Sequence, residues 1–118
     1  MTTIWRRYEA QSAHFLPHVR DGHKCKKIHG HNFRVTVYVS RPGLVDGMVV
    51  DFEVLDAIWN EHIKNHFDHD LVNTWVPNPT SEMLAMEIQA VFCAKLPPPH
   101  DVVVEVEEND RSGARYPS

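Results

Sequence analysis

The segment Asn32 to Val39 alternates apolar and polar side chains with a period of two, which predicts a strand with one buried face and one wet face. His29-Gly30-His31 leads directly into this segment. Both histidines share the odd-number parity of the apolar Phe33 and Val35, so both face inward if the strand is continuous. Desolvated imidazoles need a polar partner, and this requirement constrains the fold more than any other feature of the chain.

A metal ion is the partner that this spacing favours. Residues two apart in an extended chain point the same way, so His29 and His31 can reach one ion past the small Gly30. His14, close to the end of an expected strand from Ile4 to Phe15, can supply a third ligand if the two strands pair. Three neutral histidines with a vacant fourth position describe a catalytic zinc site. The alternative is a set of hydrogen-bonded or exposed histidines, because His-x-His is a short and common pattern.

The rest of the pattern predicts a single α+β domain over residues 1–118, with two helices on one face of an antiparallel sheet. Asp46-Gly47 predicts a turn, and Met48 to Val50 a short strand that pairs back as a hairpin. One helix is expected from an N-cap at Asp51, and a second from an N-cap at Thr80. A last strand is expected from Asp101 to Glu108. These strands are too few to close on themselves, so we expect oligomerisation to complete the sheet.

Composition excludes several classes of function. The net charge of −4 argues against a general nucleic-acid binder, and no stretch approaches the roughly 20 apolar residues that span a bilayer. The N-terminal segment lacks the apolar region of a secretory signal, and two cysteines in 118 residues favour a reducing, cytoplasmic setting. Residues 1–41 nevertheless hold eight basic and two acidic residues, a net of +6, which favours an anionic ligand in this part of the chain.

Cys25 stands four residues before His29 and is flanked by Lys24, Lys26 and Lys27. That positive environment should favour the thiolate, the form in which cysteine acts as a base or nucleophile. Two other interpretations remain open: an inert loop thiol, or a fourth zinc ligand that would make the metal site structural. The other cysteine, Cys93, lies inside the second expected helix and is predicted to be a small core residue.

Two acidic positions complete the candidate site. Asp68 precedes His69, and a carboxylate beside an imidazole can orient it and help it relay a proton. The alternative is an ordinary polar segment at the end of the first helix. Glu108 shares the parity of Val102, Val104 and Val106, so it lies on the apolar face unless the strand ends or bulges before it. A carboxylate on that face could bind two adjacent N–H donors of a ligand.

Together these residues resemble the 6-pyruvoyl-tetrahydropterin synthase family, and within it the 6-carboxy-tetrahydropterin synthases of bacterial queuosine biosynthesis. The resemblance spans nearly the whole chain. It consists of five motifs in a shared order: Ala13-His14, Gly22-His23-Lys24-Cys25 with the run to His29-Gly30-His31, Val50-Asp51-Phe52, Asp68-His69 with Leu71 and Asn73, and Asn78-Pro79-Thr80-Ser81-Glu82. The fold so implied is the tunnelling fold, in which trimers form a barrel of antiparallel strands and two trimers stack into a hexamer.

The resemblance also implies roles. It places the zinc ligands on His14, His29 and His31, the catalytic thiol on Cys25, the proton relay on Asp68 and His69, and the pterin-anchoring carboxylate on Glu108. Asn109 stands where the family usually has Thr, which leaves Glu107 as the alternative anchor. The implied substrate is 7,8-dihydroneopterin triphosphate, whose side-chain hydroxyls zinc would acidify and whose triphosphate the basic N-terminal segment could meet.

Three outcomes are compatible with that resemblance. The short Cys25 to His29 interval favours a lyase that forms 6-carboxy-tetrahydropterin and acetaldehyde, because the interval is usually longer in pyruvoyl-forming eukaryotic enzymes. The alternatives are the pyruvoyl reaction, which stops after triphosphate elimination and internal redox, and a non-catalytic zinc- or pterin-binding module.

Overall fold

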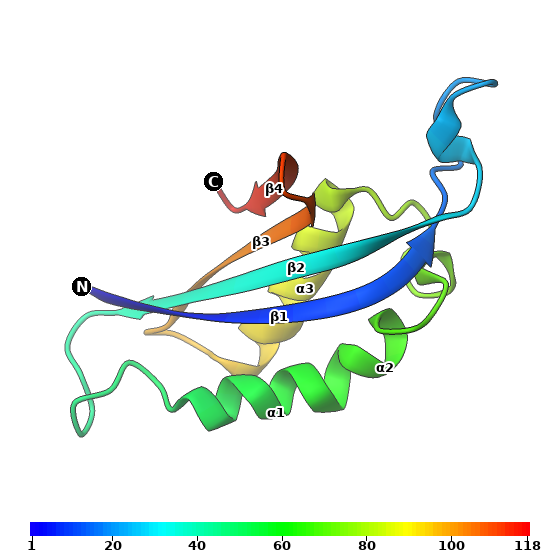
Figure 1. The fold of residues 1–118 in the computed structure, drawn as a ribbon. Helices are drawn as coiled ribbons and strands as arrows, with labels where there is room; N and C mark the ends of the chain where they lie inside the picture. The colour runs from blue at the N-terminus through cyan, green and yellow to red at the C-terminus, as the bar shows by residue number, and fades with distance from the viewer.

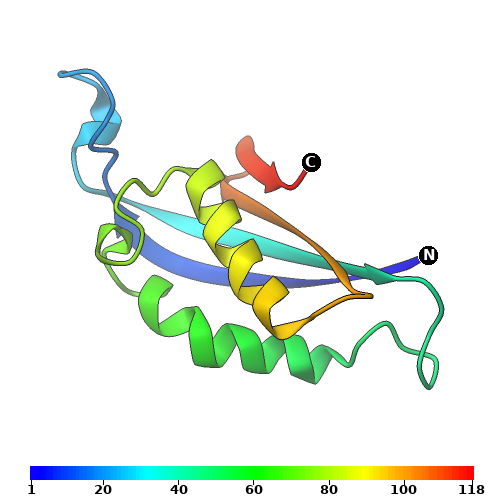
Figure 2. The same cartoon turned by 180° about the vertical axis from the view of Figure 1, so that it is seen from behind.

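The fold is one antiparallel sheet with helices packed on one side. A computed structural model describes residues 1–118. The sheet has the order β1-β2-β3-β4. In the view of Figure 2, α3 crosses in front of the strands, and in both views α1 runs alongside β1 (Figure 1). This architecture confirms the expected α+β class. The elements are β1 (Thr2–His14), η1 (Lys24–Lys26), β2 (His29–Arg41), α1 (Phe52–His62), α2 (Lys64–Phe67), η2 (Val72–Thr74), α3 (Ser81–Lys95), β3 (Asp101–Asn109) and β4 (Ser112–Tyr116).

The core lies between the sheet and the helices. On β2 the apolar residues from Phe33 to Val39 are fully buried, and Thr36 is the one residue of the opposite face that is buried as well. The even-numbered valines of β3 are buried beside them, while the odd-numbered residues face the open side. Both helices close over this surface with one apolar stripe each. The helix residues buried there are Leu55, Ile58 and Trp59 of α1 and Leu84, Ala85, Ile88 and Phe92 of α3.

The pairing of β1 with β2 brings the two histidine motifs together. The strands run antiparallel over all thirteen residues of each, and His14 stands directly opposite His29 at the end of the ladder. The connecting segment, residues 15–28, leaves the sheet at this end and carries η1, as Figure 1 shows. The metal-ligand candidates therefore lie at the end of the sheet from which this loop projects.

The predicted helix caps are confirmed. Asp51 accepts a hydrogen bond from the backbone N–H of Glu53 at 2.9 Å, and Thr80 accepts one from the backbone N–H of Met83 at 3.1 Å. The first helix ends at His62, because the backbone leaves the helical region at Ile63, and a separate short helix, α2, follows. The chain thus turns at Ile63 before it reaches Asp68.

The predicted strand from Met48 to Val50 is wrong. Val45 and Met48 exchange two backbone hydrogen bonds of 3.0 Å around Asp46 and Gly47, which both have positive φ, so the predicted turn is present. The ladder stops there because Val49 packs into the core, where it is 3% exposed. The chain then enters the α1 cap instead of pairing.

Two further expectations need correction. Cys93 is exposed, because its neighbour Phe92 occupies the buried position on that turn of α3. The strand β4 pairs with β3 but has no apolar alternation in Ser-Gly-Ala-Arg-Tyr, and the sequence pattern did not reveal it. None of the helices combines the length and hydrophobicity that crossing a bilayer requires.

Candidate metal centre and surrounding catalytic groups

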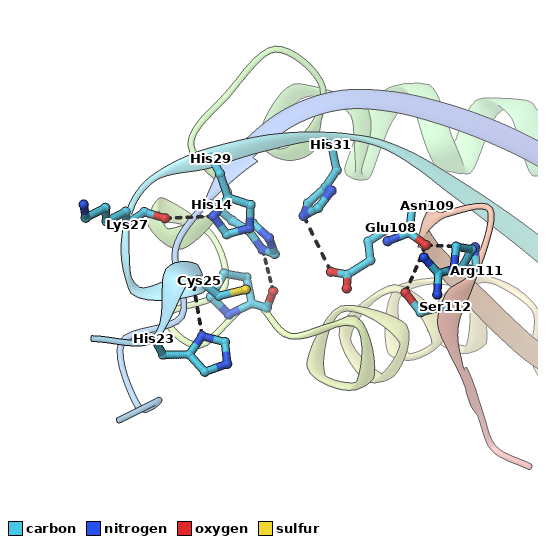
Figure 3. A network of polar contacts seen from close by, with 11 residues as sticks. His14, His23, Cys25, Lys27, His29, His31, Glu108, Asn109, Arg111 and Ser112 are labelled. Carbon is cyan, nitrogen blue, oxygen red and sulfur yellow. Dashed lines mark hydrogen bonds and ion pairs between the residues drawn. The ribbon is translucent and has the colours of Figure 1, made fainter. Parts of the chain in front are cut away.

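Three imidazoles from the ends of two paired strands converge in one cluster. His14 comes from β1, and His29 and His31 come from the start of β2 (Figure 3). One ligand nitrogen from each ring can be chosen so that all three lie within 4.8 Å of one another. The ring centroid of His14 lies 4.6 Å from that of His29 and 5.1 Å from that of His31. The strand pairing expected from the sequence is what assembles this cluster.

Backbone carbonyls orient two of the three rings. Nδ1 of His14 lies 2.9 Å from the carbonyl oxygen of Pro79, and Nδ1 of His29 lies 2.7 Å from that of Lys27. A carbonyl oxygen only accepts, so Nδ1 carries the proton in both rings and Nε2 keeps its lone pair. Figure 3 shows both of these contacts. Metal-binding histidines are held in this way, with the second ring nitrogen donating to a fixed acceptor.

One nitrogen in the cluster has no partner in the protein. His14 is 1% exposed, and its Nε2 is buried without a hydrogen bond. Leaving a buried polar atom unpaired costs about 1–3 kcal/mol, so such an atom calls for an explanation. A metal ion bound by the three imidazoles satisfies it, and the donor set therefore fits a divalent transition metal.

Burial favours the neutral, metal-binding form of two of the three imidazoles. Desolvation lowers the pKa of His14 and outweighs the opposing hydrogen bond to Pro79. Desolvation also lowers the pKa of His31, against the attraction of the nearby Glu108 carboxylate. Both rings are therefore deprotonated at neutral pH and ready to coordinate.

Glu108 reaches the same cluster from the third strand. Its Oε2 lies 3.8 Å from Nε2 of His31, and its side chain is 31% exposed. The neighbouring Glu107 points to the other face of the sheet, where its carboxylate lies 4.0 Å from Arg34. The pairing of β3 with β4 shifts register between Glu107 and Asn109, yet Glu108 keeps the face that its parity predicts. Figure 3 shows Glu108 extending towards His31.

Cys25 lies in η1, on the loop that joins the two histidine-bearing strands. Its carbonyl oxygen accepts a hydrogen bond from the N–H of Leu16 at 2.8 Å, and its own N–H donates to Nδ1 of His23 at 3.0 Å. The thiol is partly buried and is not a member of the three-histidine group. The loop is thus tied back to the residues that follow His14.

Asp68 and His69 are fastened to the outer edge of β1. The carboxylate of Asp68 accepts the N–H of Gln11 at 3.0 Å and lies 3.0 Å from Nδ1 of His69, whose own N–H donates to the carbonyl of Gln11 at 2.7 Å. Burial would raise the pKa of Asp68, but these hydrogen bonds and the His69 charge hold it below its usual value. His69 has a φ of +58° and a side chain that is 73% exposed.

Within one chain, Asp68 and His69 lie apart from the other candidate groups. No hydrogen bond or ion pair links Asp68 or His69 to Cys25 or to the three histidines. Gln11, their anchor, precedes His14 by three residues, or about 10 Å of extended strand. The exposed imidazole of His69 faces solvent instead.

Several groups that shape the site carry no signal in a sequence. The orienting acceptors of His14 and His29 are main-chain oxygens of Pro79 and Lys27, which any residue could supply. Asn73 stands in one of the family motifs, but its contacts with Phe15 appear only in the structure. Helical and strand periodicity predict which face of an element is buried. They do not predict a side-chain hydrogen bond between residues 58 positions apart.

Comparison with known proteins identifies the family. The family model described as 6-pyruvoyl tetrahydropterin synthase matches residues 3–118. The Synechocystis protein named 6-carboxy-5,6,7,8-tetrahydropterin synthase is 41% identical over 124 aligned residues, which cover 98% of this chain and 93% of that protein. A protein of Archaeoglobus fulgidus, named as a putative 6-carboxy-5,6,7,8-tetrahydropterin synthase, is 45% identical over 85 residues, which cover 71% of this chain and 70% of its own.

Solved structures agree on the fold. An uncharacterized Wolinella succinogenes protein superposes with a TM-score of 0.83 at 19% identity, covering 97% of this chain and 96% of its own. Caenorhabditis elegans 6-pyruvoyl tetrahydropterin synthase superposes with a TM-score of 0.79 at 20% identity, covering 98% and 94%. The expected tunnelling fold of the subunit is therefore confirmed. With a family model that spans almost its full length, the chain belongs to the 6-pyruvoyl tetrahydropterin synthase family.

Proposed function

We propose that this protein is a zinc-dependent lyase that converts 7,8-dihydroneopterin triphosphate and water into 6-carboxy-5,6,7,8-tetrahydropterin, acetaldehyde and triphosphate. The observation that carries the proposal is the convergence of three imidazoles and the Glu108 carboxylate on one face of the sheet. The names of the Synechocystis and Archaeoglobus relatives support the carboxy-forming reaction. In the cell, this reaction would serve queuosine biosynthesis.

His14, His29 and His31 would hold the zinc ion, each through one ring nitrogen, and burial lowers the pKa of His14 and of His31 in favour of the neutral, metal-binding form. Zinc bound there would supply Lewis acidity that lowers the pKa of the substrate's side-chain hydroxyls. The carbonyls of Pro79 and Lys27 would keep the rings of His14 and His29 aimed at that ion. We expect a vacant coordination position, because only the three histidines form the ligand group.

Cys25, Asp68 and His69 are proposed to move the protons. The Cys25 thiolate would accept a proton from the substrate side chain, and His69, oriented by Asp68, would donate and accept protons at the leaving fragments. Because the His69 side chain is exposed and makes no contact with Cys25 in one chain, we propose that a neighbouring subunit supplies this pair.

The sheet supports such an assembly. Its helix-free face carries charged ladders, such as Arg115 with Glu105 at 2.9 Å, and β1 pairs along only one edge over residues 2–10. Edges of this kind are completed by other strands. We propose a homohexamer built from two barrel-forming trimers.

Glu108 is proposed to anchor the pterin. A carboxylate can accept both N–H groups of the 2-amino and ring edge in a bidentate pair, which fixes ring orientation. Its position 3.8 Å from His31 would place the anchored ring next to the zinc ligands. Basic residues of the projecting loop, Lys24, Lys26 and Lys27 among them, would meet the triphosphate.

Product analysis tests the proposal. The zinc-loaded protein is incubated with 7,8-dihydroneopterin triphosphate, and acetaldehyde is measured by its reduction with alcohol dehydrogenase and NADH. Acetaldehyde and 6-carboxy-tetrahydropterin in equal amounts support the reaction. Appearance of 6-pyruvoyl-tetrahydropterin without acetaldehyde would instead establish the pyruvoyl reaction, the alternative suggested by the name of the family model. Release of neither product, with normal pterin binding, would identify a binding module.

We also propose that the enzyme works in the cytoplasm. Both cysteines are free in the structure, and Cys25 must stay reduced to serve as a thiolate. A reducing compartment satisfies that requirement.

A further inference from the structure

We infer that Asn73 is a positioning residue that holds the metal ligand His14 and the thiol of Cys25 in a fixed relationship. Asn73 lies in the short turn η2, which is separate from β1, from β2 and from the loop of residues 15–28. The inference rests on the proposed function for the metal ligation by His14 and for the role of Cys25, whereas the contacts of Asn73 are observed in the structure.

The side chain of Asn73 clamps the backbone of Phe15, the residue that follows His14. Oδ1 of Asn73 accepts the N–H of Phe15 at 3.0 Å, and Nδ2 donates to the carbonyl of Phe15 at 2.8 Å. The amide thus pairs with both polar groups of one residue, as a neighbouring strand would. The clamp holds the chain at the point where β1 ends, directly beside the His14 side chain.

The same amide reaches the segment that orients His14. Nδ2 of Asn73 also donates to the carbonyl of Pro77 at 3.3 Å, two residues before Pro79, whose carbonyl holds Nδ1 of His14. Pro79 is buried, and the α3 cap follows it at Thr80. Asn73 therefore ties together the backbone that carries the His14 ring and the backbone that orients it.

The hydrogen bonds between Asn73 and Phe15 also bear on the position of Cys25. Leu16, the residue after the clamped Phe15, donates its N–H to the carbonyl of Cys25 at 2.8 Å. Fixing Phe15 therefore fixes the base of the loop that carries the thiol. Asn73, which is not itself one of the proposed functional groups, thus connects His14 with Cys25. Its amide makes three hydrogen bonds, to Phe15 and Pro77, and the backbone hydrogen bond from Leu16 completes the link to Cys25.

Two substitutions separate positioning from simple stability. Asn73→Ala removes all three hydrogen bonds, whereas Asn73→Asp keeps the volume and the acceptor for the N–H of Phe15 but loses both donors. The matched control is Thr74→Ala, which removes a hydrogen bond of 2.8 Å from Thr74 to the carbonyl of Leu71 within the same turn and leaves the three hydrogen bonds of Asn73 in place. All variants are made in a Cys93→Ser background, so that Cys25 is the only thiol.

Three measurements are made on the metal-bound protein and do not require turnover. They are zinc affinity by chelator competition, the visible spectrum of the cobalt-substituted protein, and the rate of Cys25 alkylation by iodoacetamide. We expect both Asn73 variants to fold, to bind zinc about tenfold more weakly, to shift the cobalt spectrum and to alkylate faster. We expect Thr74→Ala to match the parent protein in all three measurements.

The proposal is overturned if folded Asn73 variants keep the parent's zinc affinity, spectrum and alkylation rate, or if Thr74→Ala changes them equally. It is also overturned if neither Asn73 variant folds, since Asn73 would then serve the fold as a whole. If the parent protein yields neither acetaldehyde nor 6-pyruvoyl-tetrahydropterin while the Asn73 variants behave as expected, the proposed enzyme activity fails and the positioning role stands.

Discussion

Nδ1 of His14 lies 2.9 Å from the carbonyl oxygen of Pro79, and this contact leaves Nε2 buried and unpaired. His14→Ala removes the Nε2 atom that would coordinate the metal, so we expect bound zinc to fall from about one ion per chain to almost none. Zinc content after gel filtration measures the effect. His62→Ala, at a partly exposed position of α1, is the control and should retain the metal. Equimolar zinc in His14→Ala would remove His14 from the ligand set.

A substitution of Cys25 tests whether the proposed metal site is catalytic or structural. Because its thiol lies outside the three-histidine group, we expect Cys25→Ala to keep its zinc and its thermal stability while losing lyase activity. Metal analysis and the acetaldehyde assay are run on the same preparation. Loss of zinc together with unfolding would show that Cys25 is a fourth ligand and that the metal is structural.

Glu108 and Glu107 form a matched pair on opposite faces of β3. Glu108→Gln should raise KM for the pterin substrate about tenfold or more, since hydrogen bonds to a charged group contribute about 1.5–3 kcal/mol. Glu107→Gln, which loses only the partly exposed contact with Arg34 at 4.0 Å, should leave KM nearly unchanged. Initial rates across a range of substrate concentrations decide between them. The opposite pattern would move the anchor to Glu107.

The lowered pKa of Asp68 predicts a specific acid dependence of stability. A carboxyl whose pKa is lower in the folded state binds fewer protons there than in the unfolded chain, so it stabilises the fold above its ordinary pKa of about 3.9. That contribution disappears as the pH falls through the lower folded pKa. We expect the difference in unfolding free energy between wild type and Asp68→Asn to be present at pH 5 and to shrink below about pH 4.

Urea unfolding at several pH values measures this difference. Glu61→Gln, at an exposed position of α1, serves as the control and should show no such change. A difference between wild type and Asp68→Asn that stayed constant down to pH 3 would contradict the assignment.

The positive φ of His69 predicts a conflict between stability and activity. Glycine accepts this conformation freely, so His69→Gly should be at least as stable as wild type, whereas the β-branched His69→Val should lose about 1–2 kcal/mol. Both variants should lack lyase activity. Urea denaturation measures the two stabilities, and equal stability of the glycine and valine variants would show that the backbone relaxes at this position.

Much of the site could be predicted because it depends on strand periodicity. The parity of His29 and His31 with Phe33 held along β2, and the parity of Glu108 with Val106 held in spite of the shift in register beside it. Periodicity alone left the partner of His14 open, and the structure pairs it with His29. The resemblance to the family supplied the roles that spacing could not.

What could not be predicted depends on contacts between distant segments. The pattern in Met48 to Val50 suits a strand, but burial of Val49 against the helices draws it away from the ladder. The strand β4 forms because β3 offers it an edge, although its own residues have little preference for a strand. Likewise, nothing local in the sequence shows that Gln11 anchors Asp68, or that Asn73 holds Phe15.

The ladder between β1 and β2 is unbroken, so the position of His14 beside His29 depends on the pairing along the whole length of both strands. If β1 slipped by one residue, its side chains would change faces, so His14 would leave the histidine cluster and Ala10 would leave the core, where it is now buried. Because only the native pairing brings His14, His29 and His31 together, we expect metal binding to favour this alignment of the two strands. For the same reason, we expect an insertion or deletion within either strand to separate the three histidines.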